Sequence, residues 1–99
     1  MSQKVVLKLS ADWCGPCKKI APFFHDLSKK YTDIKFIEVN VEDNFTDFHN
    51  GLSGPQIAEK YPSNGIPYFV FLHNDEKVAD MTGANELKLH SEVEKLHSI

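Results

Sequence analysis

Apolar residues follow two different periodicities along the chain, and the change between them separates strands from helices. Residues 4–9 and 34–41 are short runs rich in β-branched and aliphatic side chains, which is typical of strands. Between them, apolar side chains recur at spacings of three and four, which predicts a helix over residues 14–30. A strand, a helix and a strand in close succession predict a βαβ unit with parallel strands.

The pattern is less regular in the middle of the chain, where glycines interrupt it. Phe45, Phe48 and Leu52 keep a helical spacing, so we expect an extra helical insertion around residues 43–54. A second short helix is expected over residues 56–61, because the proline before it stands where a helix accepts proline best.

The last third of the chain predicts a β-hairpin and a closing helix. Residues 67–72 form an apolar run typical of a buried strand, residues 73–76 supply turn chemistry, and residues 77–82 return antiparallel. Apolar positions on one face predict a final helix over residues 85–97. We therefore expect an α/β protein with a four-stranded mixed sheet flanked by helices, as a single domain over residues 1–99.

Composition and charge exclude several classes of protein. The 99 residues are 41% hydrophobic, which suffices for one small core. No run of Lys or Arg exceeds two residues and the net charge is −3, so nothing indicates a nucleic-acid surface. No apolar run approaches the roughly 18 residues of a membrane span, and the N-terminal segment lacks a signal-peptide cleavage site. We expect a cytoplasmic monomer that binds neither nucleic acid nor membranes.

Candidate chemistry is concentrated in Cys14 and Cys17, the only cysteines in the chain. A thiol must be ionised to attack a disulfide. Cys14 stands at the start of a predicted helix, where the unpaired N–H groups and the helix dipole favour an anion, so we expect a lowered thiol pKa. Cys17 follows one turn later and should face inward, within reach of a mixed disulfide on Cys14. Gly15 and Pro16 set the geometry of the turn between them.

Two alternatives to redox chemistry exist for this pair of cysteines. They could be half of a zinc site, but a structural site needs four ligands, and the nearest candidate is His25, with no second Cys-x-x-Cys motif. They could also be inert core residues. In a cytosolic protein a paired thiol is more often catalytic or metal-binding than structural. We favour a redox-active dithiol that uses no metal and no cofactor.

Several motifs are shared with one protein family. Trp-Cys-Gly-Pro-Cys-Lys at residues 13–18, a proline inside the following helix, Gly-Ile-Pro at residues 65–67 and Gly-Ala at residues 83–84 resemble the thioredoxin family. The resemblance implies the thioredoxin fold and the reduction of protein disulfides, with Cys14 and Cys17 cycling between dithiol and disulfide. It also implies that electrons come from a thioredoxin reductase or from glutathione and glutaredoxin.

The resemblance assigns a surface around the dithiol to substrate binding. Trp13 would shield the disulfide and contact substrate, although a packed aromatic at a strand–helix corner is an equally good interpretation. Ile66 would offer backbone hydrogen bonds to an extended substrate segment, and the Ile66–Pro67 bond would be cis. The expected substrate-binding residues are Trp13, Gly15, Pro16, Ile66, Pro67, Gly83 and Ala84.

Two departures from the family concern the architecture. The strand and helix that usually precede the first strand are absent from this sequence, so we expect a minimal, atypically short fold in which residues 34–41 form an edge of the sheet. The stretch that contains the insertion is longer than in the family. We expect Phe45, Phe48 and Leu52 to cover apolar surface that the absent elements would have covered.

The third departure is Lys8, which stands where the family has a buried aspartate that is held to assist proton transfer at the second cysteine. Lys8 alternates with Leu7 and Leu9, so it should point beneath the dithiol, and Glu38 on the neighbouring strand is its expected partner. We hypothesise that Lys8 and Glu38 tune the thiol pKa and replace the aspartate in proton transfer. The alternative is a bystander lysine whose ammonium reaches solvent.

The predicted function is therefore that of a protein-disulfide reductase. Two other functions fit the same motifs. The chain could be a binding module that holds a partner on the surface around Trp13 and Pro67, with secondary redox activity. It could also be a more oxidising disulfide oxidase or isomerase, because a cation near the sulfurs stabilises the reduced form.

Overall fold

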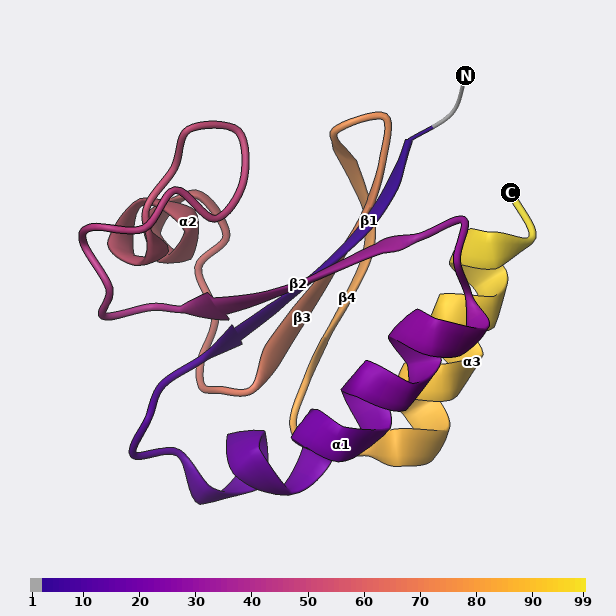
Figure 1. The fold of residues 1–99 in the computed structure, drawn as a ribbon, viewed down its shortest axis with the longest axis horizontal. Helices are drawn as coiled ribbons and strands as arrows, with labels where there is room; N and C mark the ends of the chain where they lie inside the picture. The colour runs from indigo at the N-terminus through magenta and orange to yellow at the C-terminus, as the bar shows by residue number, and fades with distance from the viewer. Residues whose placement is uncertain (1–2) are drawn as a thin grey trace.

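A computed structural model describes residues 3–99 of the chain. Met1 and Ser2, the start of the N-terminal segment for which no signal-peptide cleavage site is expected, lie outside the described residues. The elements follow the order β1 (Lys4–Ser10), α1 (Gly15–Lys30), β2 (Lys35–Asn40), α2 (Gly54–Lys60), β3 (Tyr68–His73), β4 (Glu76–Thr82) and α3 (Glu86–His97), as Figure 1 shows.

The four strands form one mixed sheet in the order β2-β1-β3-β4, which confirms the predicted fold class. β1 pairs with β2 in parallel and with β3 antiparallel, and β4 completes the β3 hairpin. The central strand β1 is buried from Val5 to Ser10, so it is covered on both of its faces. β2 lies at one edge of the sheet, as the sequence analysis expected.

Helices cover both faces of this sheet. Figure 1 shows α1 and α3 side by side on one face and α2 by itself on the other. On the first face, Phe24 of α1 and Leu89 of α3 belong to one buried cluster with Val6 and Phe69. On the second face, Ile57 of α2 packs in a separate cluster with apolar residues of β1 and β3 such as Leu7 and Val70. The alternation of side chains along each strand thus supplies two cores from one sheet.

The helix predicted around residues 43–54 is absent, and α2 begins only at Gly54. A side chain explains the start of this irregular segment: the Asp43 carboxylate accepts hydrogen bonds from the backbone N–H groups of Phe45 and Thr46, at 2.8 and 3.1 Å, and from the Thr46 hydroxyl. Such local bonds offer the backbone an alternative to a helix. The hydroxyl and backbone donors also hold the pKa of the Asp43 carboxyl below its usual value, although partial desolvation opposes them.

Further along this segment, two residues with positive φ angles are incompatible with a right-handed helix. Asn50 and Gly51 adopt φ values of +53° and +76°, in the left-handed region. The turn that they make joins His49 to Leu52 in an isolated antiparallel bridge. The segment is therefore a folded loop that is held by turns.

The expectation that this segment covers apolar surface is partly confirmed. Phe48 and Leu52 are half-buried and pack against the cluster under α2. Phe45 was expected to join them, which is wrong, because 97% of this residue is exposed. The turn at Asp43 directs Phe45 away from the sheet.

Among the described residues, no helix combines the length and the apolar character that a membrane crossing requires.

Candidate functional site

Cys14 and Cys17 are joined by a disulfide at the junction of β1 and α1, with their Cα atoms 5.2 Å apart. Cys14 is the N-cap residue of α1 and has extended backbone angles, and the Cys17 N–H donates to the Cys14 sulfur at 3.1 Å. Pro16 lies in the first turn, where its missing N–H removes no helical hydrogen bond.

The N-cap position surrounds the Cys14 sulfur with groups that favour a negative charge. The first turn of α1 carries no acidic side chain, so the positive end of the helix dipole is not neutralised there. The N–H of Cys17 already points at this sulfur, and a hydrogen bond to a charged acceptor is about twice as strong as one to a neutral acceptor. A thiolate on Cys14 would therefore be stabilised without any rearrangement of the helix.

Three loops meet around the disulfide. The Ile66–Pro67 peptide bond is cis, as expected, and the Ile66 carbonyl oxygen lies 3.8 Å from the Cys14 sulfur. The loop after β4 joins this arrangement through the N–H of Gly83, which donates to the Pro67 carbonyl at 2.8 Å. The structure therefore brings the expected substrate-binding residues of all three loops to one end of the sheet, with Gly15, Pro16 and Ala84 exposed and Pro67 buried.

Trp13 lies beside the disulfide in sequence and is 68% exposed, so the packed-aromatic interpretation is wrong. Its indole N–H donates to the Glu42 carboxylate at 3.1 Å. Glu42 lies two residues after the end of β2 and was not singled out from the sequence. This hydrogen bond holds the exposed indole against the loop that precedes α2.

Both sulfur-bearing residues are themselves buried. Cys14 is 4% exposed and Cys17 1% exposed, a small difference in the direction that the helical positions predict. The exposed neighbours Trp13, Gly15 and Pro16 form the rim around them.

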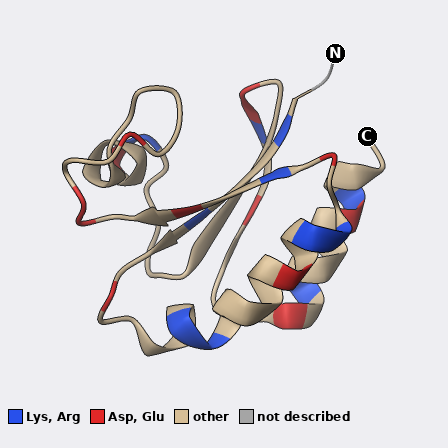
Figure 2. Cartoon of the chain, viewed as in Figure 1, with Lys and Arg blue, Asp and Glu red and all other residues tan. Residues whose placement is uncertain are grey.

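Lys8 lies beneath the dithiol and is 1% exposed, so its ammonium does not reach solvent as the bystander interpretation required. Its ammonium donates to the Cys17 carbonyl at 2.9 Å and to the Glu38 carboxylate at 2.6 Å. Lys8 and Glu38 are register partners on the adjacent strands β1 and β2, and Figure 2 shows basic and acidic segments on these strands. The expected pair is thus present.

A cavity of about 120 Å³ opens beside this pair. Its lining includes Lys8, Cys17, Glu38 and Asp12. A polar cavity of this size can hold water. The region under the second cysteine is therefore a charged and hydratable space, in contrast to the apolar packing elsewhere under α1.

A second polar cluster near the site was missed by the sequence analysis. The buried Tyr68 follows the cis proline, and its hydroxyl donates to the Asp80 carboxylate at 2.6 Å. Lys77 donates to the same carboxylate at 3.1 Å. Burial, and then the bond to Asp80, raise the pKa of Tyr68, whereas the bonds from Tyr68 and Lys77 lower the pKa of Asp80. This cluster borders a hollow of about 420 Å³ that Ser63 also lines.

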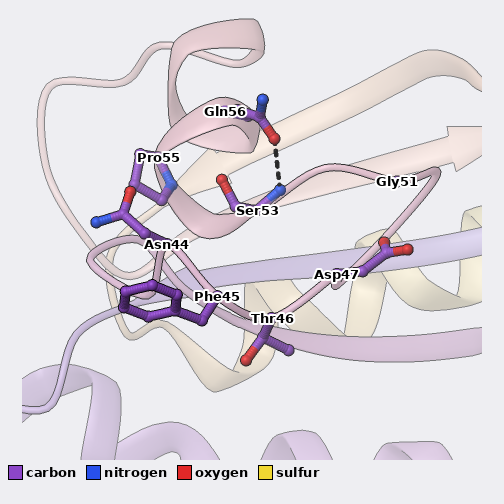
Figure 3. A pocket seen from close by; sticks show the side chains of 8 residues that line it. All are labelled: Asn44, Phe45, Thr46, Asp47, Gly51, Ser53, Pro55 and Gln56. Carbon is purple, nitrogen blue, oxygen red and sulfur yellow. Dashed lines mark hydrogen bonds between the residues drawn. The ribbon is translucent and has the colours of Figure 1, made fainter.

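The irregular segment before α2 contains a further hollow, of about 400 Å³, which Figure 3 shows. It is lined by Asn44, Phe45, Thr46, Asp47, Gly51, Ser53, Pro55 and Gln56. The Gln56 side chain accepts a hydrogen bond from the Ser53 N–H at 2.9 Å, which completes a capping box at the start of α2. Neither cysteine lines this hollow.

Residues 3–99 contain no cluster of three His, Cys, Asp or Glu side chains that is arranged to bind a metal ion.

The thioredoxin family model matches residues 1–95 of the chain. The chain is 39% identical to thioredoxin of Ophiophagus hannah over 94 residues, which span 95% of the chain and 80% of the relative. Human thioredoxin is also 39% identical, over 92 residues that span 93% of the chain and 78% of the relative. The X-ray structure of Fasciola hepatica thioredoxin superimposes with a TM-score of 0.81 at 31% identity, covering 95% of this chain and 81% of that one. The chain therefore belongs to the thioredoxin family and is a thiol–disulfide oxidoreductase of that family.

Proposed function

We propose that the protein is an electron carrier that reduces disulfides in other proteins, with Cys14 as the attacking residue and Cys17 as the resolving residue. The Cys14 thiolate attacks one sulfur of the substrate disulfide, forms a mixed disulfide and releases the other substrate sulfur as a thiolate. The Cys17 sulfur, after losing its proton, then attacks Cys14. This step breaks the mixed disulfide, frees the second substrate thiol and leaves the Cys14–Cys17 disulfide.

The observation that carries this proposal is the position of the disulfide at the N-terminus of α1. Cys14 caps the helix and accepts the Cys17 N–H, while the two Cα atoms are 5.2 Å apart. The same N–H can therefore stabilise a Cys14 thiolate in the dithiol state, and the resolving sulfur needs no large movement of the backbone.

The proposed substrate surface is the rim of the three loops, which includes Trp13, Gly15, Pro16, Ile66, Pro67, Gly83 and Ala84. An extended substrate segment would lie along the loop at Ile66 and pair with its backbone, as in strand addition. The carbonyl of Ile66 is only 3.8 Å from the Cys14 sulfur, so backbone pairing there would position a substrate disulfide over the attacking atom. Trp13 would cover the apolar part of the substrate, since its indole is exposed and held at one edge by Glu42.

The electron donor in this proposal is a thioredoxin reductase, or glutathione together with glutaredoxin. The support is the family membership and the presence of a single dithiol, which must be reduced again after each turnover. We further propose that the protein acts in the cytoplasm as a monomer, as a single domain over residues 1–99, in electron transport and cell redox homeostasis. Two cysteines used as one redox pair suit a reducing compartment, where structural disulfides are rare.

Reduction of insulin disulfides, with dithiothreitol as the electron source, tests the proposal. The wild-type protein should accelerate the reaction, and Cys14→Ser and Cys17→Ser should each remove the acceleration. Ser98→Ala, a similarly small change at the end of α3, should behave as wild type. Circular dichroism of each variant serves as the folding control. A folded Cys14→Ser variant with wild-type activity would refute the proposal, and unimpaired partner binding by an inactive wild-type protein would favour the binding-module alternative.

A further inference from the structure

The most unusual group near the disulfide is a buried cation. Lys8 is 1% exposed, and its ammonium touches the backbone of Cys17 at 2.9 Å and the Glu38 carboxylate at 2.6 Å. The ring centroid of Phe24 lies 5.8 Å from the same nitrogen. A buried charge is costly unless it is well paired, and this one contacts the backbone of the second redox cysteine.

The pairing with Glu38 compensates this cation only in part. The Glu38 side chain is 41% exposed, whereas that of Lys8 is 1% exposed. Solvent and salt screen the carboxylate, while the ammonium on the protein side of the pair is screened far less. The ammonium is therefore the less screened charge of the pair, and it is the one that contacts Cys17.

The disulfide and the dithiol respond differently to this ammonium. A disulfide carries no charge and offers the ammonium nothing beyond the Cys17 carbonyl. The reduced pair supplies an anion whenever one sulfur is ionised, and in a buried site that anion interacts strongly with a nearby cation. Lys8 therefore stabilises the reduced state more than the oxidised state.

We propose that Lys8 is a positioning residue that shifts the redox equilibrium towards the dithiol, and so makes the Cys14–Cys17 disulfide a stronger oxidant than it would be without this cation. The inference rests on the proposed dithiol function. A more oxidising disulfide would allow the protein to receive electrons from weaker thiol reductants, a class that includes glutathione. Glu38 limits the shift of the redox equilibrium, because its carboxylate partly neutralises the Lys8 ammonium.

The equilibrium with glutathione measures this effect directly. Two glutathione molecules each give one thiol hydrogen, the bond between their sulfurs forms, and the Cys14–Cys17 bond breaks to leave two protein thiols, one of which is partly ionised and releases its proton to the solvent. In a glutathione redox buffer at pH 7, Lys8→Met should lower the equilibrium constant for reduction of the protein about tenfold. A tenfold change corresponds to about 30 mV for this two-electron couple.

Two further variants separate charge from structure. Lys8→Gln keeps a hydrogen-bond donor for the Cys17 carbonyl but has no charge, so it should shift the equilibrium in the same direction, and it replaces Lys8→Met if that variant does not fold. Lys4→Met is the matched control, because Lys4 lies at the far end of the same strand and is paired with Asp33. This control should keep the wild-type equilibrium.

The stability of the two redox states gives an independent measurement. By the thermodynamic cycle, the ratio of the unfolding equilibrium constants of the reduced and oxidised forms should change by the same factor of about ten in Lys8→Met. If the folded Lys8 variants equilibrate with glutathione within twofold of wild type, the role of Lys8 is refuted while the dithiol function stands. If the wild-type protein does not equilibrate with glutathione or any dithiol, the proposed function itself is refuted.

Discussion

The start of α2 offers a sharp test of how the irregular segment is anchored to the sheet. Gly54 is buried, and a Cβ atom at this position would lie 1.8 Å from the carbonyl oxygen of Asn40 and 2.8 Å from its carbonyl carbon. Ordinary contacts of this kind begin near 3.4 Å. Both atoms belong to the backbone at the end of β2, so no side chain can rotate away to make room. In Gly54→Ala either α2 or the end of β2 must move.

The expected cost follows from this overlap. Overpacking of a buried site usually costs about 1–3 kcal/mol, and a clash with backbone atoms falls at the upper end of that range. We therefore expect Gly54→Ala to lower the free energy of unfolding by about 3 kcal/mol. A domain of this size is stable by roughly 5–15 kcal/mol, and its Tm should fall by about 12–24 °C at roughly 4–8 °C per kcal/mol.

Urea denaturation, followed by circular dichroism, measures this change. Gly15→Ala is the matched control, because a Cβ at Gly15 meets no atom within 4 Å. That substitution should leave stability unchanged or raise it by up to about 1 kcal/mol, since it only restricts the unfolded chain. A cost below about 1 kcal/mol for Gly54→Ala, with an unchanged m-value, would refute the account of how α2 packs on β2.

Two further predictions concern other parts of the fold. Phe45→Ser should change the free energy of unfolding by less than about 0.5 kcal/mol, because the side chain is exposed. Phe48→Ser should lower the free energy of unfolding by about 1–3 kcal/mol, because Phe48 packs against the α2 cluster. Urea denaturation measures both variants, and a larger loss of stability in Phe45→Ser than in Phe48→Ser would contradict this prediction. The bonds from Tyr68 and Lys77 lower the pKa of Asp80 below its usual 3.8, so they contribute stability that is present above about pH 4 and is lost as the pH falls through the folded-state pKa. Tyr68→Phe should therefore reduce stability at pH 7 and lose less on acidification to pH 2.5 than wild type does, and an identical acid loss in both proteins would show that Tyr68 does not act on this carboxyl.

The sequence was sufficient for the parts of the fold that depend on periodic burial. α1 buries residues at helical intervals, and β1 is a short, continuously buried run. Both patterns can be seen in the sequence before any tertiary contact is known. The spacing of Phe45, Phe48 and Leu52 was misleading, because three apolar residues at helical intervals do not outweigh an aspartate that binds the following backbone. Local hydrogen bonds and positive φ angles decided the conformation there.

Some contacts of the candidate site could be predicted from the sequence and others could not. The dithiol could be predicted because its chemistry lies within four consecutive residues, and the Lys8–Glu38 pair because both residues lie on adjacent strands of a βαβ unit. The bond between Tyr68 and Asp80 depends on the register of the β3–β4 hairpin, in which Tyr68 stands opposite Thr82, two positions from Asp80. The contact between Trp13 and Glu42 joins two loops, and no periodicity indicates which loop residues meet.

Trapping of the mixed disulfide tests the central assignment most directly. Cys17→Ser cannot resolve the intermediate, so reaction with a disulfide-containing peptide should give a stable adduct, and mass spectrometry after digestion should locate the peptide on Cys14. Cys14→Ser should form little adduct under the same conditions, because Cys17 is buried inside the first turn of α1. Its sulfur does not occupy the N-cap position, where the helix N–H groups would stabilise a thiolate. Faster adduct formation on Cys17 in Cys14→Ser than on Cys14 in Cys17→Ser would contradict the account.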